Sequence, residues 1–322
     1  MGNVKSTKPK TMKRLLPIFA AFIFLYSASA QSISPSALEM KIDSLVSQTL
    51  KADQPGGVVG VISNNQIVFK KAYGLMNLDY NLPNTETTAF NLASVSKQFT
   101  AFAIMLLEQD GKLKLDDDIH QYLAWLPDYG QKITIRNLLH HTSGISPSDN
   151  LKLFAGISLE SPWTTEDEIE LMCRYTKLNF KPNDEHLYSN AGYFLLAQIV
   201  EKASQQTFSE FMKTRIFTPL GMRNSVIYDQ QGKIITNRAS GYKKSGEDYI
   251  RMNSEADSFF GESNLYTSLN DMLLWCENLL QTKVGTQEMT NRIFNPSDTT
   301  NKGDTLNYTY GFNVWKYKGN VN

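Results

Sequence analysis

The stretch from Ser94 to Gln109, "SVSKQFTAFAIMLLEQ", constrains the fold of this chain more than any other. It contains neither Gly nor Pro, and apolar side chains such as Phe99, Phe102 and Leu106 recur at helical spacing until Gly111 interrupts the pattern. That spacing places the apolar groups on one face, which has to be buried against other elements. The sequence therefore predicts a buried helix with Ser94 in its first turn.

Ser94 and Lys97 are three residues apart and are neighbours on one face of such a helix. Helical side chains lean toward the N-terminus, which carries the Lys97 amine back toward the Ser94 hydroxyl. An ammonium in the first turn meets the positive end of the helix dipole and, if it is also desolvated, loses affinity for its proton. A neutral lysine can then accept the serine proton, while the helix end offers the Ser94 N–H to an oxyanion. The pair is a candidate nucleophile and base.

A plainer interpretation stays open, in which the serine caps the helix and the lysine lies exposed on its surface. Ser240 and Lys243 in "SGYK" have the same spacing, although Gly241 lies between them and polar residues follow. Chance therefore produces this motif easily, and its surroundings have to decide which match is functional.

A second polar pair, Tyr188 and Asn190, lies in "FKPNDEHLYSNAGYFLL", after a turn and before an apolar helix. In an extended segment residues two apart point to the same side, so the phenol and the amide face one way. A tyrosine near cations can relay protons, and an asparagine amide can hold a lysine or a substrate carbonyl. The alternative is that Asn190 caps the helix and Tyr188 packs.

The rest of the chain reads as a mixture of helices and strands. Residues 34–52 have an amphipathic helical pattern, and two β-branched runs around Asn64-Asn65 predict a tight hairpin. Helices and loops are expected over residues 112–255, with a further helix in "SLNDMLLWCENLL". The aromatic run "YTYGFNVWKY" predicts a late strand, and "KGN" after it a turn.

Ser94-x-x-Lys97 at a helix start and Tyr188-x-Asn190 some ninety residues later resemble the serine β-lactamase and penicillin-binding protein superfamily. The similarity covers roughly residues 36–316 and points to the branch of class C β-lactamases, D-alanyl-D-alanine carboxypeptidases and family VIII esterases. "ITIRNLLHHTSGI" resembles a loop of that branch, which implies a structural role for His141, Ser143 and Gly144.

This resemblance implies an α/β (α+β) fold of the β-lactamase/transpeptidase type, with an antiparallel sheet flanked by helices and a separate helical lobe. It also implies that Ser94 is acylated, that Lys97 activates it, that Tyr188 takes part in proton transfer and that Asn190 binds the lysine or the substrate. The family's third motif, Lys-Thr-Gly or His-x-Gly, would follow "YGFNVWKYKGN", and it is absent from the 322 residues. We therefore expect the C-terminal strands to be missing, and both an active and an inactive state stay open for the chain as given.

Residues 1–30 have the pattern of a secretory signal peptide. Five basic residues precede the apolar run "LLPIFAAFIFLY", and Ala28-Ser29-Ala30 offers a cleavage point. The run is too short to span a bilayer comfortably, which disfavours a retained anchor. We therefore expect an exported protein, periplasmic or secreted, whose hydrolase domain is residues 31–322. Without the leader, 27 basic residues face 32 acidic ones, so the charge offers no field for nucleic acid.

Other chemistries fit the sequence poorly. His140 and His141 are adjacent, and neither they nor His120 and His186 form a metal-binding motif, so no metal and no organic cofactor is expected. The Gly-x-Ser-x-Gly of α/β-hydrolases is absent as well. Cys173 and Cys276 both lie in apolar, helix-like stretches, and we favour two buried thiols over a disulfide.

Two functions from different classes follow. The favoured one is a serine hydrolase that acts on a small-molecule or peptide substrate, such as a peptidoglycan stem peptide, an ester or a β-lactam. The alternative is a non-catalytic protein of the same fold that binds cell-wall peptide or a protein partner. The sequence leaves the oligomeric state open.

Overall fold

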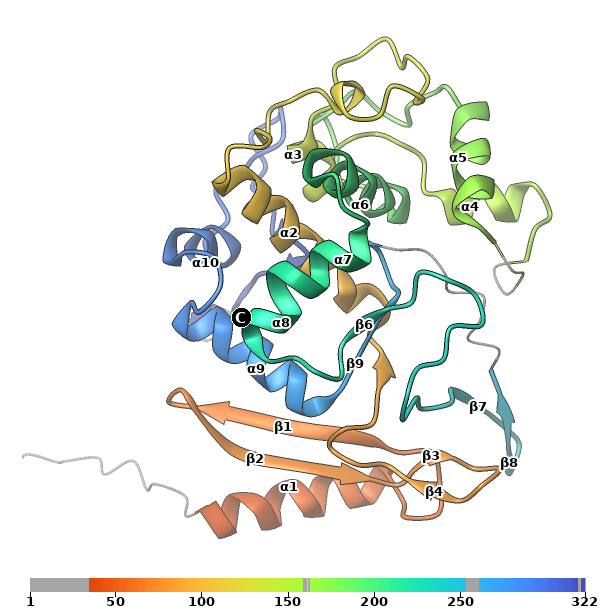
Figure 1. Ribbon diagram of the computed structural model, residues 1–322, viewed down its shortest axis with the longest axis vertical. Coiled ribbons are helices and arrows are strands. Elements are labelled where there is room, and N and C mark those ends of the chain that lie inside the picture. Colours follow the sequence, from red (N-terminus) through yellow and green to blue (C-terminus); the bar gives the residue numbers. More distant parts are fainter. Residues whose placement is uncertain (1–34, 159–160, 162, 253–260, 318–319, 322) are drawn as a thin grey trace, which may run out of the picture.

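A hairpin covered by a helix on each side forms one end of the molecule (Figure 1). The computed structural model describes residues 35–158, 161, 163–252, 261–317 and 320–321, so the expected signal peptide lies outside the described residues. Strands β1 (Gly57–Ser63) and β2 (Gln66–Tyr73) pair antiparallel, with Gly57 opposite Tyr73 and Ser63 opposite Gln66. Helix α1 (Pro35–Thr49) lies against β2 and helix α9 (Leu269–Gln281) against β1.

The hairpin turn and the two flanking helices confirm what the sequence predicts. Asn64 and Asn65 have φ angles of 50° and 59°, the left-handed pair that a two-residue hairpin loop requires. Gly60 allows α9 to approach β1 closely, since a Cβ there would lie 2.8 Å from a Leu269 methyl carbon. This layer is therefore fixed mainly by local sequence.

The other strands form small antiparallel sheets, which together with the helices give the predicted α/β class. Strand β9 (Leu265–Thr267) lies between β5 (Phe90–Asn91) and β6 (Val226–Ile227). The remaining pairs are β3 (Leu75–Asn77) with β4 (Leu82–Pro83), β7 (Tyr242–Ser245) with β8 (Asp248–Arg251), β10 (Tyr308–Thr309) with β11 (Phe312–Asn313), and β12 (Lys316–Tyr317) with β13 (Asn320–Val321).

The single late strand expected over "YTYGFNVWKY" is wrong. Tyr310 and Gly311 have φ angles of 46° and 88°, so the chain reverses after Thr309 and the run divides into short strands. Gly311 is required there, because a Cβ would lie 2.6 Å from the backbone nitrogen of Gln98 and 2.7 Å from the carbonyl carbon of Lys97. The turn is thus pressed against the first turn of the central helix.

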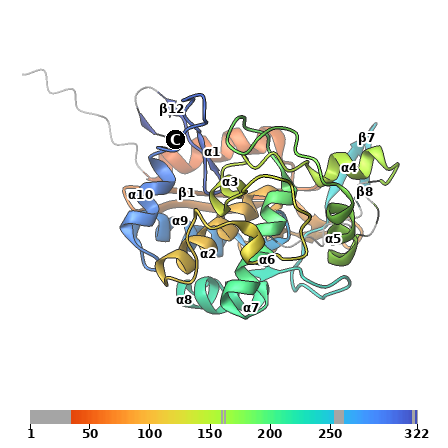
Figure 2. The same cartoon turned by 90° about the horizontal axis from the view of Figure 1, so that it is seen from above.

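The helical lobe surrounds helix α2 (Lys97–Gln109), the central buried helix that the sequence predicts. Helix α6 (Asn190–Ser204) packs along it, and Phe99 stacks on Trp275 of α9 at 4.3 Å between ring centroids. Figure 2 shows the other helices arranged around this pair. They are α3 (Ile135–Leu139), α4 (Ser148–Phe154), α5 (Thr165–Arg174), α7 (Phe208–Met212), α8 (Thr218–Leu220), α10 (Gln287–Phe294), the 3₁₀ turns Ala93–Ser96 and Ile119–Gln121, and a π-helical turn Lys213–Phe217.

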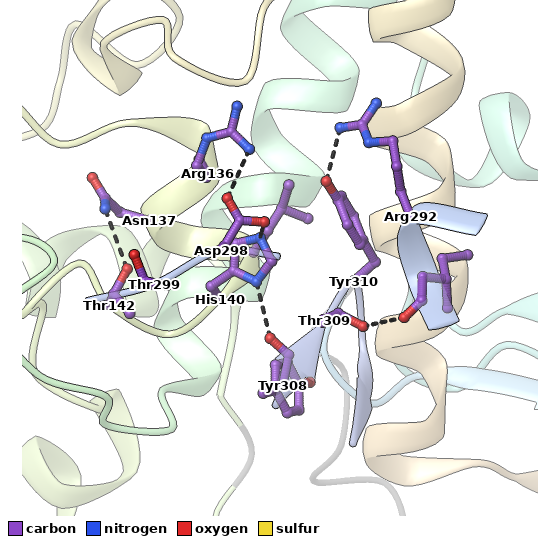
Figure 3. A network of polar contacts seen from close by, with 12 residues as sticks. Arg136, Asn137, His140, Thr142, Arg292, Asp298, Thr299, Tyr308, Thr309 and Tyr310 are labelled. Atoms are coloured by element: carbon purple, nitrogen blue, oxygen red, sulfur yellow. Dashed lines mark hydrogen bonds and ion pairs between the residues drawn. The ribbon is translucent and has the colours of Figure 1, made fainter. Parts of the chain in front are cut away.

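A network of polar contacts fastens the segment that contains β10 to the helical lobe (Figure 3). Arg136 lies 3.1 Å from Asp298, and the Nε2 atom of His140 lies 3.3 Å from the same carboxylate. The Nδ1 atom of His140 donates to the Tyr308 carbonyl oxygen at 2.9 Å. On the other side of the turn, Arg292 of α10 donates to the Tyr310 hydroxyl at 2.8 Å.

The two cysteines are unpaired among the described residues. The expectation that both are buried is wrong, because Cys173 is exposed and Cys276 is half-buried. The reason for Cys173 is that α5 buries only a narrow stripe, formed by Glu168 and Met172, and the thiol lies beside that stripe. None of the helices in the described ranges has the length and apolar character that a membrane crossing needs.

Candidate active site

Ser94 lies on the 3₁₀ turn Ala93–Ser96 that leads directly into α2. The sequence predicts that Ser94 lies in the first turn of the helix. The structure places it three residues before the α-helical part begins. Ala93 has a φ of 45°, an uncommon angle for an alanine, and its N–H donates to Oδ1 of Asn91 at 2.6 Å. This bend leaves the Ser94 side chain exposed at the surface.

The Lys97 side chain is completely buried, with 0% of its surface exposed. Its Nζ atom lies 3.2 Å from Ser94 Oγ, 2.8 Å from Asn190 Oδ1 and 3.0 Å from the carbonyl oxygen of Glu262. A charged amine donates to all three oxygens. A neutral amine has two hydrogens and a lone pair, so it can keep the Asn190 and Glu262 bonds and accept the Ser94 hydroxyl hydrogen.

Asn190 is the first residue of α6, and its side chain turns toward the lysine rather than capping the helix. The N-cap is Ser189, which makes no side-chain capping bond within the described residues. The Asn190 amide oxygen accepts from Lys97, and its nitrogen donates to Oδ2 of Asp149 at 2.7 Å. The interpretation of Asn190 as a cap is therefore wrong, and the structure brings it to Lys97.

Tyr188 lies beside Lys97 at the protein surface, with 40% of its own surface exposed. The centre of its ring is 5.1 Å from Lys97 Nζ, and the buried Tyr193 ring is 5.6 Å from the same atom. Both rings can stabilise a cation through their π faces. In the part of the chain that the structure describes, the Tyr188 hydroxyl makes no hydrogen bond to Ser94 or Lys97. Tyr188 approaches Lys97 Nζ through its ring.

The loop that carries His141, Ser143 and Gly144 packs against Tyr188 and Ser189. The His141 ring packs against Tyr188 with ring centres 4.3 Å apart, and its Nδ1 accepts the Ser189 N–H at 3.2 Å. Burial, followed by the nearby Lys97 charge, holds the pKa of His141 well below its ordinary value. Gly144 has a φ of 76°, and a Cβ there would lie 2.2 Å from the Phe180 carbonyl oxygen.

Glu262 completes the lysine site, although no motif in the sequence indicates it. Its carbonyl oxygen binds Lys97 because the chain at Gly261 passes very close to α6, where a Cβ would lie 2.5 Å from the Tyr193 carbonyl oxygen. Its carboxyl group is buried, and burial raises the pKa of Glu262 to about 8, an effect that the Lys97 charge partly opposes. Every residue type has a backbone carbonyl, so the sequence does not indicate which one binds Lys97.

The second Ser-x-x-Lys match is different in the structure. Lys243 lies exposed on β7, and Ser240 lies just before that strand, so the pair does not share a buried helix. Among the described residues, no group of three or more His, Cys, Asp or Glu side chains could hold a metal ion. The structure thus brings together Ser94, Lys97, Asn190 and Tyr188, and it separates them from the chance match.

Comparison with known proteins identifies a family and several relatives. A family model described as Beta-lactamase matches residues 42–321. Penicillin-binding protein 4* of Bacillus subtilis (strain 168) is 30% identical over 272 residues, which cover 80% of this chain and 59% of that protein. The chain thus spans less than two thirds of the length of this relative.

Two further relatives extend the comparison. Teichoic acid D-alanine hydrolase of Staphylococcus aureus is 24% identical over 296 residues, covering 90% of this chain and 71% of that protein. The octameric penicillin-binding protein homologue from Pyrococcus abyssi superimposes with a TM-score of 0.73 at 24% identity, covering 89% of this chain and 67% of that one.

Proposed function

The chain belongs to the beta-lactamase family, and we propose that it is an exported serine hydrolase that forms an acyl-enzyme on Ser94. The observation that carries this proposal is the fully buried Lys97 amine, 3.2 Å from an exposed serine hydroxyl. A nucleophile within hydrogen-bond reach of its base is the arrangement that covalent catalysis needs.

In the first step, the neutral Lys97 amine takes the Ser94 proton while Oγ attacks the carbonyl carbon of an amide, ester or β-lactam. The carbonyl π electrons move onto oxygen, and the Ser94 N–H at the start of the helix is placed to stabilise that charge. Collapse of the tetrahedral species breaks the bond to the leaving group and leaves an ester on Ser94. The Lys97 ammonium returns the proton to the leaving group, with Tyr188 as the proposed relay.

In the second step, water attacks the ester by the same route, so Lys97 again accepts and returns one proton. Asn190 is proposed to hold the amine throughout, as its 2.8 Å contact suggests. For the substrate we propose acyl donors of the cell wall, among them stem peptides and D-alanyl esters. The names of a penicillin-binding protein and of a teichoic acid D-alanine hydrolase among the relatives support this class. The basic and apolar residues 1–30 support export to the periplasm or the medium.

The test is covalent labelling of the full chain with a fluorescent penicillin and, in parallel, with a fluorophosphonate, followed by peptide mapping. We expect an adduct on Ser94 that the Ser94→Ala variant lacks. Ser240→Ala is the matched control, because it removes the serine of the second Ser-x-x-Lys match, and its labelling should equal that of the wild type. A folded wild-type chain without an adduct from either probe would favour the non-catalytic binder.

A further inference from the structure

We propose that Asp149 is a positioning residue, which acts through the Asn190 amide to hold the Lys97 amine at Ser94. The inference rests on the proposed function and adds a residue to its machinery. Asp149 is half-buried in the first turn of α4, and its Oδ2 atom accepts from Asn190 Nδ2 at 2.7 Å. Lys97 therefore forms one end of a chain of contacts that ends in a carboxylate.

The amide of an asparagine has two ends of nearly the same shape and opposite hydrogen-bonding character. Lys97 can keep its lone pair free for the Ser94 proton only when the Asn190 oxygen faces the amine. An ionised carboxylate only accepts hydrogen bonds, so Asp149 requires the nitrogen of that amide to face it. The reversed amide would set its NH₂ group against the amine, where it would occupy the lone pair that the Ser94 proton needs. Its oxygen would face a carboxylate, which has no hydrogen to donate.

Helix α4 is itself held in place by a buried ion pair in its last turn. Lys152 lies three residues after Asp149, and its Nζ atom is 3.5 Å from Oε2 of Glu168 on α5. Both side chains are almost fully buried, and the indole nitrogen of Trp163 donates to Glu168 at 3.0 Å. Buried charges of this kind are costly to separate, which gives Asp149 a fixed base on a short helix.

Loss of the Asp149 carboxylate leaves the Asn190 amide free to rotate or to reverse. The Lys97 amine then loses one of its three oxygen partners and with it a defined direction toward Ser94. A displacement of about 1 Å in a reacting group can lower a rate roughly 100-fold. We therefore expect Asp149→Ala to slow acylation by about 10- to 100-fold without weakening substrate binding.

The experiment is a double-mutant cycle on the full chain, with the rate of Ser94 labelling by a fluorophosphonate as the readout. Asp149→Ala is made alone and in the Asn190→Ala background. If Asp149 acts through Asn190, its loss slows labelling in the wild-type background and by less than about threefold in the other. Steady-state hydrolysis of a p-nitrophenyl ester should show the loss in kcat, with KM unchanged.

Asp167→Ala is the matched control, since Asp167 is also a first-turn carboxylate and caps α5 through Thr164. It should cost stability but leave labelling unchanged. Equal slowing by Asp149→Ala in both backgrounds, or equal slowing by Asp167→Ala, would overturn the proposal.

A crystal structure of the Asp149→Ala variant separates this inference from the proposed function. A displaced Asn190 amide and a longer Lys97–Ser94 distance support the positioning role, even for a chain that neither probe labels. An unchanged Lys97–Ser94 distance overturns it, even for a chain that is acylated.

Discussion

At the residue scale, the enclosure of Lys97 sets the chemistry of the site. An amine with no contact with solvent needs protein partners in place of water, and Lys97 has three oxygens and two aromatic rings around it. Asn190 and Glu262 supply two of the oxygens, and Ser94 supplies the third. In the proposed mechanism, the contact with Ser94 is the one through which the proton moves.

The proposed role of Lys97 as a base predicts the effect of Lys97→Met, which keeps a side chain of similar length and removes the amine. Acylation should slow by about 10³-fold or more, in line with the usual contribution of a general base. The Asn190 oxygen and the Glu262 carbonyl lose a donor, so the free energy of unfolding should fall by about 1–3 kcal/mol with the fold retained. The measurements are labelling kinetics and urea unfolding.

Lys243→Met provides the comparison for this variant, because Lys243 is exposed on β7 and belongs to the second Ser-x-x-Lys match. Its rate and stability should stay at the wild-type level. A Lys97→Met variant that acylates at nearly the wild-type rate would remove the general-base assignment.

The raised pKa of Glu262 predicts how stability depends on pH. The folded chain holds this proton up to about pH 8, whereas the unfolded chain releases it near the ordinary value of 4.5. Between these values the folded state binds more protons, so stability falls as pH rises, by up to about 1.4 kcal/mol per pH unit. Glu262→Gln should remove this contribution. Melting temperatures from pH 5 to 8 check it, and parallel curves for the variant and the wild type would contradict it.

At the element scale, the turn between β10 and β11 packs against the start of α2, three residues after Ser94. Gly311 lies against the backbone at Lys97 and Gln98 so closely that even one methyl group has no room. The start of α2 and the late strand pair are therefore fitted to each other, although they are more than two hundred residues apart in the sequence.

The tight fit of this turn predicts a large cost for Gly311→Ala. Gly246, in the turn between β7 and β8, also has a positive φ of 63°, but none of the described atoms lies within 4 Å of a Cβ placed there. Gly246→Ala should therefore cost only the backbone penalty of about 1–2 kcal/mol. Gly311→Ala adds a backbone clash, so it should cost clearly more and also slow the labelling of Ser94. Urea unfolding of the two variants measures the difference, and equal costs would contradict the close fit.

The sequence predicts those parts of this architecture whose pattern is local. Helix α2 and the hairpin of β1 and β2 follow from periodicity and from Asn64-Asn65. The spacing of Tyr188 and Asn190 predicts that they face one side, and both lie beside Lys97. The late strand could not be predicted correctly, because the turn at Gly311 is selected by contact with α2. The Glu262 carbonyl reaches Lys97, and Asp149 reaches Asn190, only through tertiary structure, so no spacing in the sequence indicates either contact.

At the scale of the whole molecule, Asp298 joins the C-terminal part of the described chain to the helical lobe. Its carboxylate faces both His140 and Arg136, and His140 in turn binds the Tyr308 carbonyl (Figure 3). Through Tyr308 this junction reaches the aromatic cluster of Tyr188, His141 and Tyr193 that surrounds the lysine. A change at Asp298 should therefore be felt as loss of global stability.

This junction predicts a dependence of stability on acid. The contact with His140, followed by those with Arg136, holds the pKa of Asp298 below its ordinary value of 3.8. The carboxylate therefore stabilises the fold above that pH, and the contribution is lost as pH falls below it. Asp298→Asn should lower the free energy of unfolding by about 2 kcal/mol at pH 6, and the difference from the wild type should shrink toward pH 3. Unfolding curves at both pH values decide it, and a gap that widens in acid would count against the junction.

The bend at Ala93 has a consequence for how the substrate specificity of such a molecule can change. It leaves Ser94 exposed, whereas the amine of Lys97, the proposed proton acceptor, is fully buried. The residue that would meet a new substrate is thus separate from the residue that would drive the reaction. Surface loops near Ser94 can change in length or in charge while the buried contacts of Lys97 stay the same. New substrate specificities can therefore arise from changes in these loops alone.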